Sequence, residues 1–139
     1  MEHTSASASR TARQRPLIFW QVISALLLLA MGGIHLYLVT DGVGGLLGVL
    51  FVLNAIGGLL LAIAMIAAPK RFLPGASVLS LVFMVGTLLA LVLALTVGLF
   101  GITEKLSGEL VQTTLIVESI GTIVLAVTTV LAFRLGRSR

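Results

Sequence analysis

Residues 45–68, GLLGVLFVLNAIGGLLLAIAMIAA, decide the fold, because they run for 24 positions without a charged side chain. At a rise of about 1.5 Å per residue, a helix of this length crosses a hydrocarbon core of about 30 Å. Its one strongly polar side chain is Asn54. The sequence therefore predicts a transmembrane helix over this stretch.

The composition of the whole chain indicates that lipid surrounds most of it. The 139 residues are 58% hydrophobic and 10% charged, and the mean hydropathy is +1.18. A soluble domain is usually about 45–50% apolar and about 25% charged. The absence of cysteine excludes disulfides and cysteine metal sites.

Three more apolar runs complete the predicted fold, an all-α membrane protein built as a four-transmembrane-helix bundle. Residues 1–15 are expected to be a disordered basic tail, 16–134 the transmembrane domain and 135–139 a second short tail. The expected spans are 17–39, 45–68, 75–100 and 110–133. The prolines lie at span boundaries, where a missing N–H costs least. A signal peptide is the alternative for the first run, but its apolar region would be shorter, about 7–15 residues.

Lysine and arginine predict the topology. The basic residues of both tails and of the middle loop fall on one side: Arg10, Arg13, Arg15, Lys70, Arg71, Arg134, Arg137 and Arg139. The other side holds Lys105 alone. Because loops rich in Lys and Arg stay inside, both termini are expected in the cytoplasm and the spans in the cell membrane. The charge of +4 is thus a topology signal, and no nucleic-acid partner is expected.

The two halves of the chain resemble each other. The aligned segments are 34–41 (IHLYLVTD) with 97–104 (VGLFGITE), and 54–62 (NAIGGLLLA) with 118–126 (ESIGTIVLA). In this alignment Asp41 matches Glu104, and Asn54 matches Glu118. A true repeat predicts two tandem helical hairpins related by a pseudo-two-fold axis along the membrane normal. The alternative is a chance alignment of Leu- and Ala-rich helices.

Three polar residues inside the spans form a candidate intramembrane site: Glu118, Asn54 and His35. Spanning helices keep polar residues where they pack or act. By helical rise, Glu118 and Asn54 lie about 5 Å from the midplane and His35 about 10 Å, all in the outer half. Glu118 is either a proton or cation site or a protonated structural link between helices. One outward cavity is the hypothesis that joins all three, and it requires Asn54 and Glu118 to face the same interior.

Small residues at a spacing of four mark a predicted helix-packing face on the third span: Gly86, Ala90, Ala94 and Gly98. Such a face lets another helix approach closely. The spacing leaves open whether that helix belongs to this chain, to a second copy in a homo-oligomer or to another membrane protein.

Catalytic chemistry is not expected from the residues present. A bis-His haem needs two intramembrane histidines, and a catalytic metal needs about three protein ligands. No phosphate loop, nucleotide fingerprint or Gly-x-Ser-x-Gly motif occurs. The chain is therefore predicted to be a non-enzymatic accessory or interaction subunit without cofactor or metal. The alternative is an oligomeric proton- or cation-coupled transporter that uses Glu118.

Four short segments resemble a group of small actinobacterial four-span membrane proteins. The segments are 33–38 (GIHLYL), 48–55 (GVLFVLNA), 100–104 (FGITE) and 117–118 (VE). The resemblance covers the four spans and not the N-terminal tail. It implies the fold, the membrane location and a role for His35, Asn54 and Glu118, and it implies no reaction.

Overall fold

The structure, a computed structural model, describes residues 2–108 and 110–138. Over this part of the chain it consists of four helices and their loops. They are α1 (Glu2–Thr40), α2 (Gly45–Ala67), α3 (Leu73–Thr96) and α4 (Val111–Arg137). Each is long and apolar enough to cross a membrane. The predicted all-α four-helix bundle is confirmed, and we treat the four helices as membrane spans.

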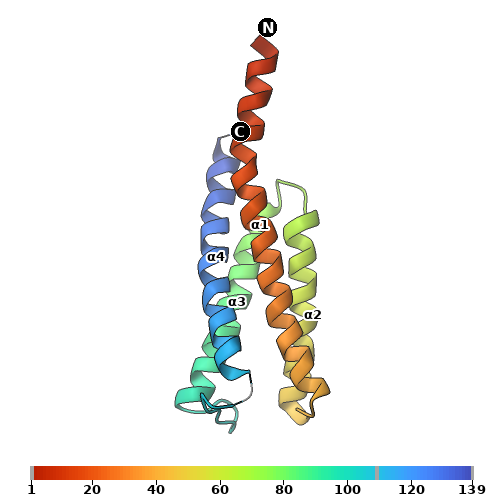
Figure 1. Cartoon of the computed structure of the whole chain (residues 1–139), viewed down its shortest axis with the longest axis vertical. Coiled ribbons are helices and arrows are strands. Elements are labelled where there is room, and N and C mark those ends of the chain that lie inside the picture. Colours follow the sequence, from red (N-terminus) through yellow and green to blue (C-terminus); the bar gives the residue numbers. More distant parts are fainter. Residues whose placement is uncertain (1, 109, 139) are drawn as a thin grey trace.

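Helices that follow each other in the sequence run antiparallel, so both described chain ends lie at the same end of the bundle (Figure 1). α1 packs along α2, α3 packs along α4, and α1 also contacts α4. Of the neighbouring helices, α2 and α3 contact each other least. The bundle is therefore two hairpins joined mainly along α1 and α4. The pseudo-two-fold relation between them stays a prediction.

Glycines bring α1 and α2 together where they cross. A Cβ atom at Gly58 would lie 2.9 Å from the Leu28 carbonyl oxygen, and one at Gly32 would lie 3.3 Å from the Ala55 Cα. Neither neighbour can move aside, because both are backbone atoms. The absence of a side chain at these two positions therefore sets the distance between the helices, as small residues do in membrane helix pairs.

The buried core lies between the four helices, each of which contributes to it. Leu28, Met65, Met84 and Leu125, one from each helix in turn, are fully buried and belong to one apolar cluster. A Cβ atom at Gly121 of α4 would lie 2.6 Å from the Met84 Cε atom. The thioether of Met84 thus fills the space that the glycine leaves, which flexible methionine does well.

Polar side chains tie the helices together at the end of the bundle that carries the chain termini. Ser24 of α1 and Thr128 of α4 share a hydrogen bond of 2.9 Å between their hydroxyl oxygens. Gln21 donates through Nε2 to the Met65 carbonyl oxygen at 2.8 Å. In a membrane such bonds matter, because lipid supplies no competing hydrogen-bond partner and no hydrophobic drive between helices.

Helix boundaries differ from the sequence prediction by more than two residues in three places. α3 ends at Thr96 instead of residue 100, because Gly98 takes a φ of +85° that a helix cannot continue. Residues 2–15 continue α1 where a disordered tail was expected. They contain no Gly or Pro to interrupt a helix, and Gln14 accepts a hydrogen bond of 2.9 Å from Lys70.

α4 likewise continues to Arg137, three residues past the predicted transmembrane domain. Met1 and Arg139, the outermost residues of the two predicted tails, lie outside the described residues.

Candidate functional site

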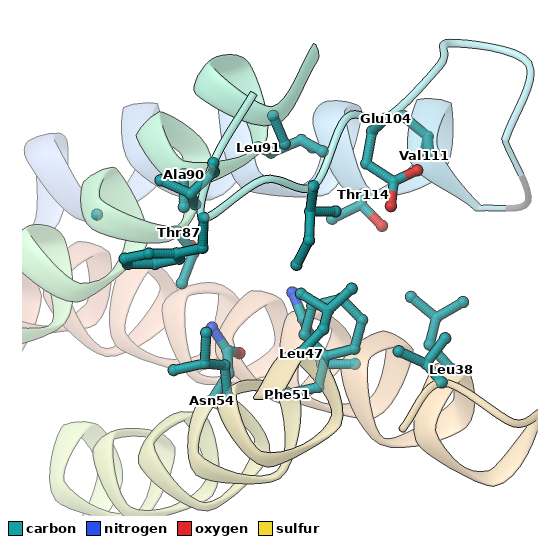
Figure 2. Close-up of a pocket in the computed structure, with 18 of the residues that line it drawn as sticks. Leu38, Leu47, Phe51, Asn54, Thr87, Ala90, Leu91, Glu104, Val111 and Thr114 are labelled. Atoms are coloured by element: carbon teal, nitrogen blue, oxygen red, sulfur yellow. The ribbon is translucent and has the colours of Figure 1, made fainter. Parts of the chain in front are cut away.

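A cavity of about 610 Å³ lies between the two hairpins. It occupies the end of the bundle opposite the chain termini, where the loops 41–44 and 97–110 connect the helices. Figure 2 shows two walls that face each other across it: Leu47, Phe51 and Asn54 on one side, Thr87, Ala90 and Leu91 on the other. Apolar side chains make up most of the lining.

The face of small residues on α3 opens this cavity. Gly86, Ala90 and Ala94 all line it, and a Cβ atom at Gly86 would meet nothing within 4 Å. Gly86 thus faces open space, whereas Ala94 is buried. Gly98 lies beyond the end of α3 and does not belong to the helical face. Packing of this face against a second chain stays a prediction.

An aromatic side chain sets the width of the gap between α2 and α3. A Cβ atom at Gly57 of α2 would lie 2.7 Å from Cζ of Phe83, so the Phe83 ring reaches from α3 to the α2 backbone. Phe83 also lines the cavity. The ring therefore occupies the space between the two helices at the inner limit of the cavity, and the small residues beyond it leave the space open.

The structure brings two of the three predicted site residues into the cavity. His35 of α1 and Asn54 of α2 line it, whereas Glu118 of α4 is fully buried and does not. Thr114, one helical turn before Glu118, lines the cavity in its place. Glu118 lies close to Thr87, which is itself a lining residue. The hypothesis of one cavity that holds all three residues is therefore wrong, since Glu118 lies just behind the wall.

His35 is held by its own helix and by an aromatic neighbour. Its Nδ1 atom lies 2.8 Å from the Met31 carbonyl oxygen. A carbonyl oxygen cannot donate, so Nδ1 carries the proton, and Nε2 of the neutral ring keeps a free lone pair. The ring meets Phe51 edge to face at 4.7 Å between centroids. The imidazole is thus fixed in orientation and offers an acceptor.

The other polar groups of the inner cavity also offer acceptors. Asn54 Oδ1 is buried and has no hydrogen-bond partner among the described residues. Thr114 donates its hydroxyl proton to the Leu110 carbonyl oxygen at 2.8 Å. The single hydroxyl proton of Thr87 is directed to the Met84 carbonyl oxygen at 2.9 Å or to the Met31 sulfur at 3.2 Å. What remains on both threonines is lone pairs.

Two carboxylates line the outer part of the cavity. Asp41 follows α1, and half-buried Glu104 lies in the loop between α3 and α4. No Lys or Arg belongs to the lining. No sequence pattern assigned these two carboxylates to a site, although the repeat alignment pairs Asp41 with Glu104. Thr87 could not be predicted as a cavity residue, because nothing in the sequence distinguishes it from the other hydroxyl residues of α3.

The loop that carries Glu104 is folded over the end of α3. Leu99 and Ile102 exchange two backbone hydrogen bonds of 2.8 Å. Phe100 and Gly101 between them have φ of 51° and 77°, which makes a tight turn of the hairpin type. The Glu104 amide donates to the Ala94 carbonyl oxygen at 2.9 Å. These bonds fix the Glu104 backbone beside the cavity.

In the part of the chain that the structure describes, no three His, Cys, Asp or Glu side chains are grouped so that they could hold a metal ion. Comparison of the chain with protein-family models, with curated proteins and with solved structures found no match. The resemblance to small actinobacterial four-span proteins therefore stays a prediction. The function has to be argued from the cavity and its chemistry.

Proposed function

We propose that this chain is a multi-pass protein of the cell membrane, with both termini in the cytoplasm, that binds an amphipathic organic cation between its two hairpins. The ligand has an apolar body and an amine or ammonium head group. One observation carries the proposal: the cavity combines apolar walls with hydrogen-bond acceptors and two carboxylates, and no Lys or Arg belongs to its lining.

The size and lining of the cavity suit a ligand rather than a few water molecules. Its volume of about 610 Å³ falls within the range of about 300–1,000 Å³ typical of small-molecule sites. Such sites are mostly apolar with a small number of placed polar groups. Here those groups are His35 and Asn54 in the inner part and Asp41 and Glu104 in the outer part.

The charge and hydrogen-bond pattern favours a cation. A head group with N–H donors can bond to Asn54 Oδ1, which has no partner among the described residues. A charged donor forms a stronger hydrogen bond with this oxygen than a neutral donor does. The rings of Phe51, Phe83 and Phe100 add aromatic faces that attract cations. An anionic ligand would meet Asp41 and Glu104 with no Lys or Arg in the lining to offset them.

This proposal keeps the non-enzymatic character expected from the sequence and departs from the accessory-subunit prediction. That prediction depended on the small-residue face of α3 as a contact for another helix. Three of its residues line the cavity instead. The proposal therefore takes up the ligand-binding part of the alternative, the cation-coupled carrier.

Binding can be tested with three ligands of one shape and different charge. The full chain in lipid nanodiscs is dialysed against adamantan-1-amine, adamantan-1-ol or adamantane-1-carboxylate, with empty nanodiscs as the control for partition into lipid. We expect saturable binding of the amine, weaker binding of the alcohol and none of the carboxylate. Equal retention of all three ligands, no greater than in empty nanodiscs, would refute the proposal.

Matched variants test whether the amine binds in the cavity. Asn54→Leu removes the free acceptor at similar volume, and we expect at least a tenfold weaker affinity for the amine, about the value of one charge-assisted hydrogen bond. Lys105→Gln changes an exposed loop residue that is not part of the lining. This control variant should bind the amine as the original chain does.

A further inference from the structure

We propose that Glu118 is a proton site behind the cavity wall, and that it gives up its proton when the cationic head group of a ligand enters. This inference rests on the proposed function and adds an exchange to it: one proton leaves the membrane-embedded region for each organic cation that binds.

The surroundings of Glu118 suit a neutral carboxyl group. The residue has no exposed surface, and neither carboxyl oxygen has a hydrogen-bond partner among the described residues. A carboxylate without donors or a counter-charge is strongly disfavoured in an apolar interior. A protonated carboxyl group carries no charge, so its burial costs far less there.

Thr87 connects this carboxyl group to the cavity. The threonine is part of the lining and also lies close to the Glu118 side chain. The residues packed beside it are methionines: Met31 receives a Thr87 contact at 3.2 Å, and Met84 fills the space at Gly121. Methionine side chains change rotamer at little cost. A head group bound at Asn54 and Thr87 can therefore come close to Glu118 without movement of a helix.

No ionisable group of the neighbouring helices can take the place of the ligand. The sequences of α2 and α3 contain no Asp, Glu, Lys, Arg or His at all. On α4 the other ionisable residues are Arg134 and Arg137, in its last turn at the far end of the bundle. The membrane-spanning part of α1 contributes His35 alone, one turn from Met31. A positive charge next to Glu118 has to come from the cavity, where the other charges are the carboxylates of Asp41 and Glu104.

The exchange balances in atoms and charge. Before binding, Glu118 carries its proton and the buried region is neutral. When the ammonium ion enters, the carboxyl O–H bond breaks, the proton leaves through the cavity to water, and the carboxylate pairs with the ammonium ion. The net charge of the buried region stays the same. Entry of the cation without loss of the proton would add an uncompensated charge to the membrane interior, which is the costlier path.

Proton release upon binding tests the inference. Adamantan-1-amine is added to the full chain in weakly buffered nanodiscs at pH 7, and a pH-indicator dye reports released protons against the amount of ligand bound. We expect about one proton per bound amine. With Glu118→Gln, which keeps the shape of the side chain, we expect binding through the cavity and no proton release. Lys105→Gln, which changes an exposed loop residue outside the cavity lining, is the control and should release protons as the original chain does.

The pH dependence of affinity gives a second measurement that needs no variant. If one proton leaves for each ligand, the dissociation constant falls tenfold for each unit of rising pH in the range where Glu118 is protonated in the free protein and the amine stays charged. Binding of the amine without proton release and without this slope would overturn the inference and leave the proposed function standing. Equal proton release from Glu118→Gln would also overturn it. No binding at all would overturn both.

Discussion

Substitution of Gly58 by alanine tests the claim that glycine sets the distance between α1 and α2. A Cβ atom at this position would lie 2.9 Å from the Leu28 carbonyl oxygen, a backbone atom that cannot turn away. A carbon and an oxygen this close must separate, and α1 has to shift along its contact with α2. Overpacking of this kind costs about 1–3 kcal/mol in well-packed interiors.

Two glycines on the partner helix α1, Gly33 and Gly32, supply the reference for this magnitude. A Cβ atom at Gly33 would meet nothing within 4 Å, so Gly33→Ala brings the helix-propensity gain without a clash. A Cβ atom at Gly32 would lie 3.3 Å from the Ala55 Cα, a tight contact but a smaller overlap than the one at Gly58. We therefore expect the free energy of unfolding to fall in the order Gly33→Ala, Gly32→Ala, Gly58→Ala. The first and last should differ by about 1–3 kcal/mol.

The assay is reversible unfolding in mixed micelles with a rising mole fraction of dodecyl sulfate. Fluorescence of Trp20, the single tryptophan of the chain, can follow the loss of packing because the Trp20 carbonyl oxygen lies 3.4 Å from Thr128 Oγ1 on α4. If Gly58→Ala proved as stable as Gly33→Ala, the α1–α2 contact would not be limited by the backbone approach at Gly58. The account of this helix pair would then be refuted.

Four further substitutions test the cavity, the hydrogen bond between Ser24 and Thr128, and the buried carboxyl group. Ala90→Leu should lower amine affinity at least tenfold in the dialysis assay and leave unfolding unchanged, because its added atoms enter the cavity. Ser24→Ala and Thr128→Ala, measured singly and together, should show a coupling free energy of about 0.6 kcal/mol, the average for such bonds in membranes. Glu118→Leu should raise the free energy of unfolding by about 1–2 kcal/mol, because it removes buried acceptors that have no partner. If Glu118 were instead a hydrogen-bonded link between helices, Glu118→Leu would lower that free energy.

Hydropathy predicted the helices of this chain well because the bilayer imposes a length on each apolar run. α2 begins at the predicted residue and ends one residue early. The end of α3 was missed by four residues, since the loop after it is apolar as well and hydropathy does not register a turn. The positive φ values at Gly98 and Phe100 end the helix inside the apolar run.

The candidate site was predictable only in part, because polarity identifies a residue and not the direction in which it points. His35 and Asn54 were found by their polarity and do line the cavity, whereas Glu118 lies behind its wall. The small residues of α3 were found by their spacing, but spacing alone fits two outcomes, close helix contact or open space. Here the small residues border open space, and Phe83 packs on Gly57 beside them. No local sequence pattern predicts that contact.

The uneven contact between the helices has a mechanical consequence. The hairpins meet along α1 and α4, while α2 and α3 stay apart over the length of the cavity and are joined by the loop 68–72 at the opposite end. This short loop limits how far α2 and α3 can separate at the end of the bundle where it lies, and Lys70 of the loop also bonds to Gln14 of α1. A small rotation about the α1–α4 contact would therefore be amplified at the far ends of α2 and α3. The gap between α2 and α3 is therefore the side from which a molecule dissolved in the lipid could enter the cavity without passing through water.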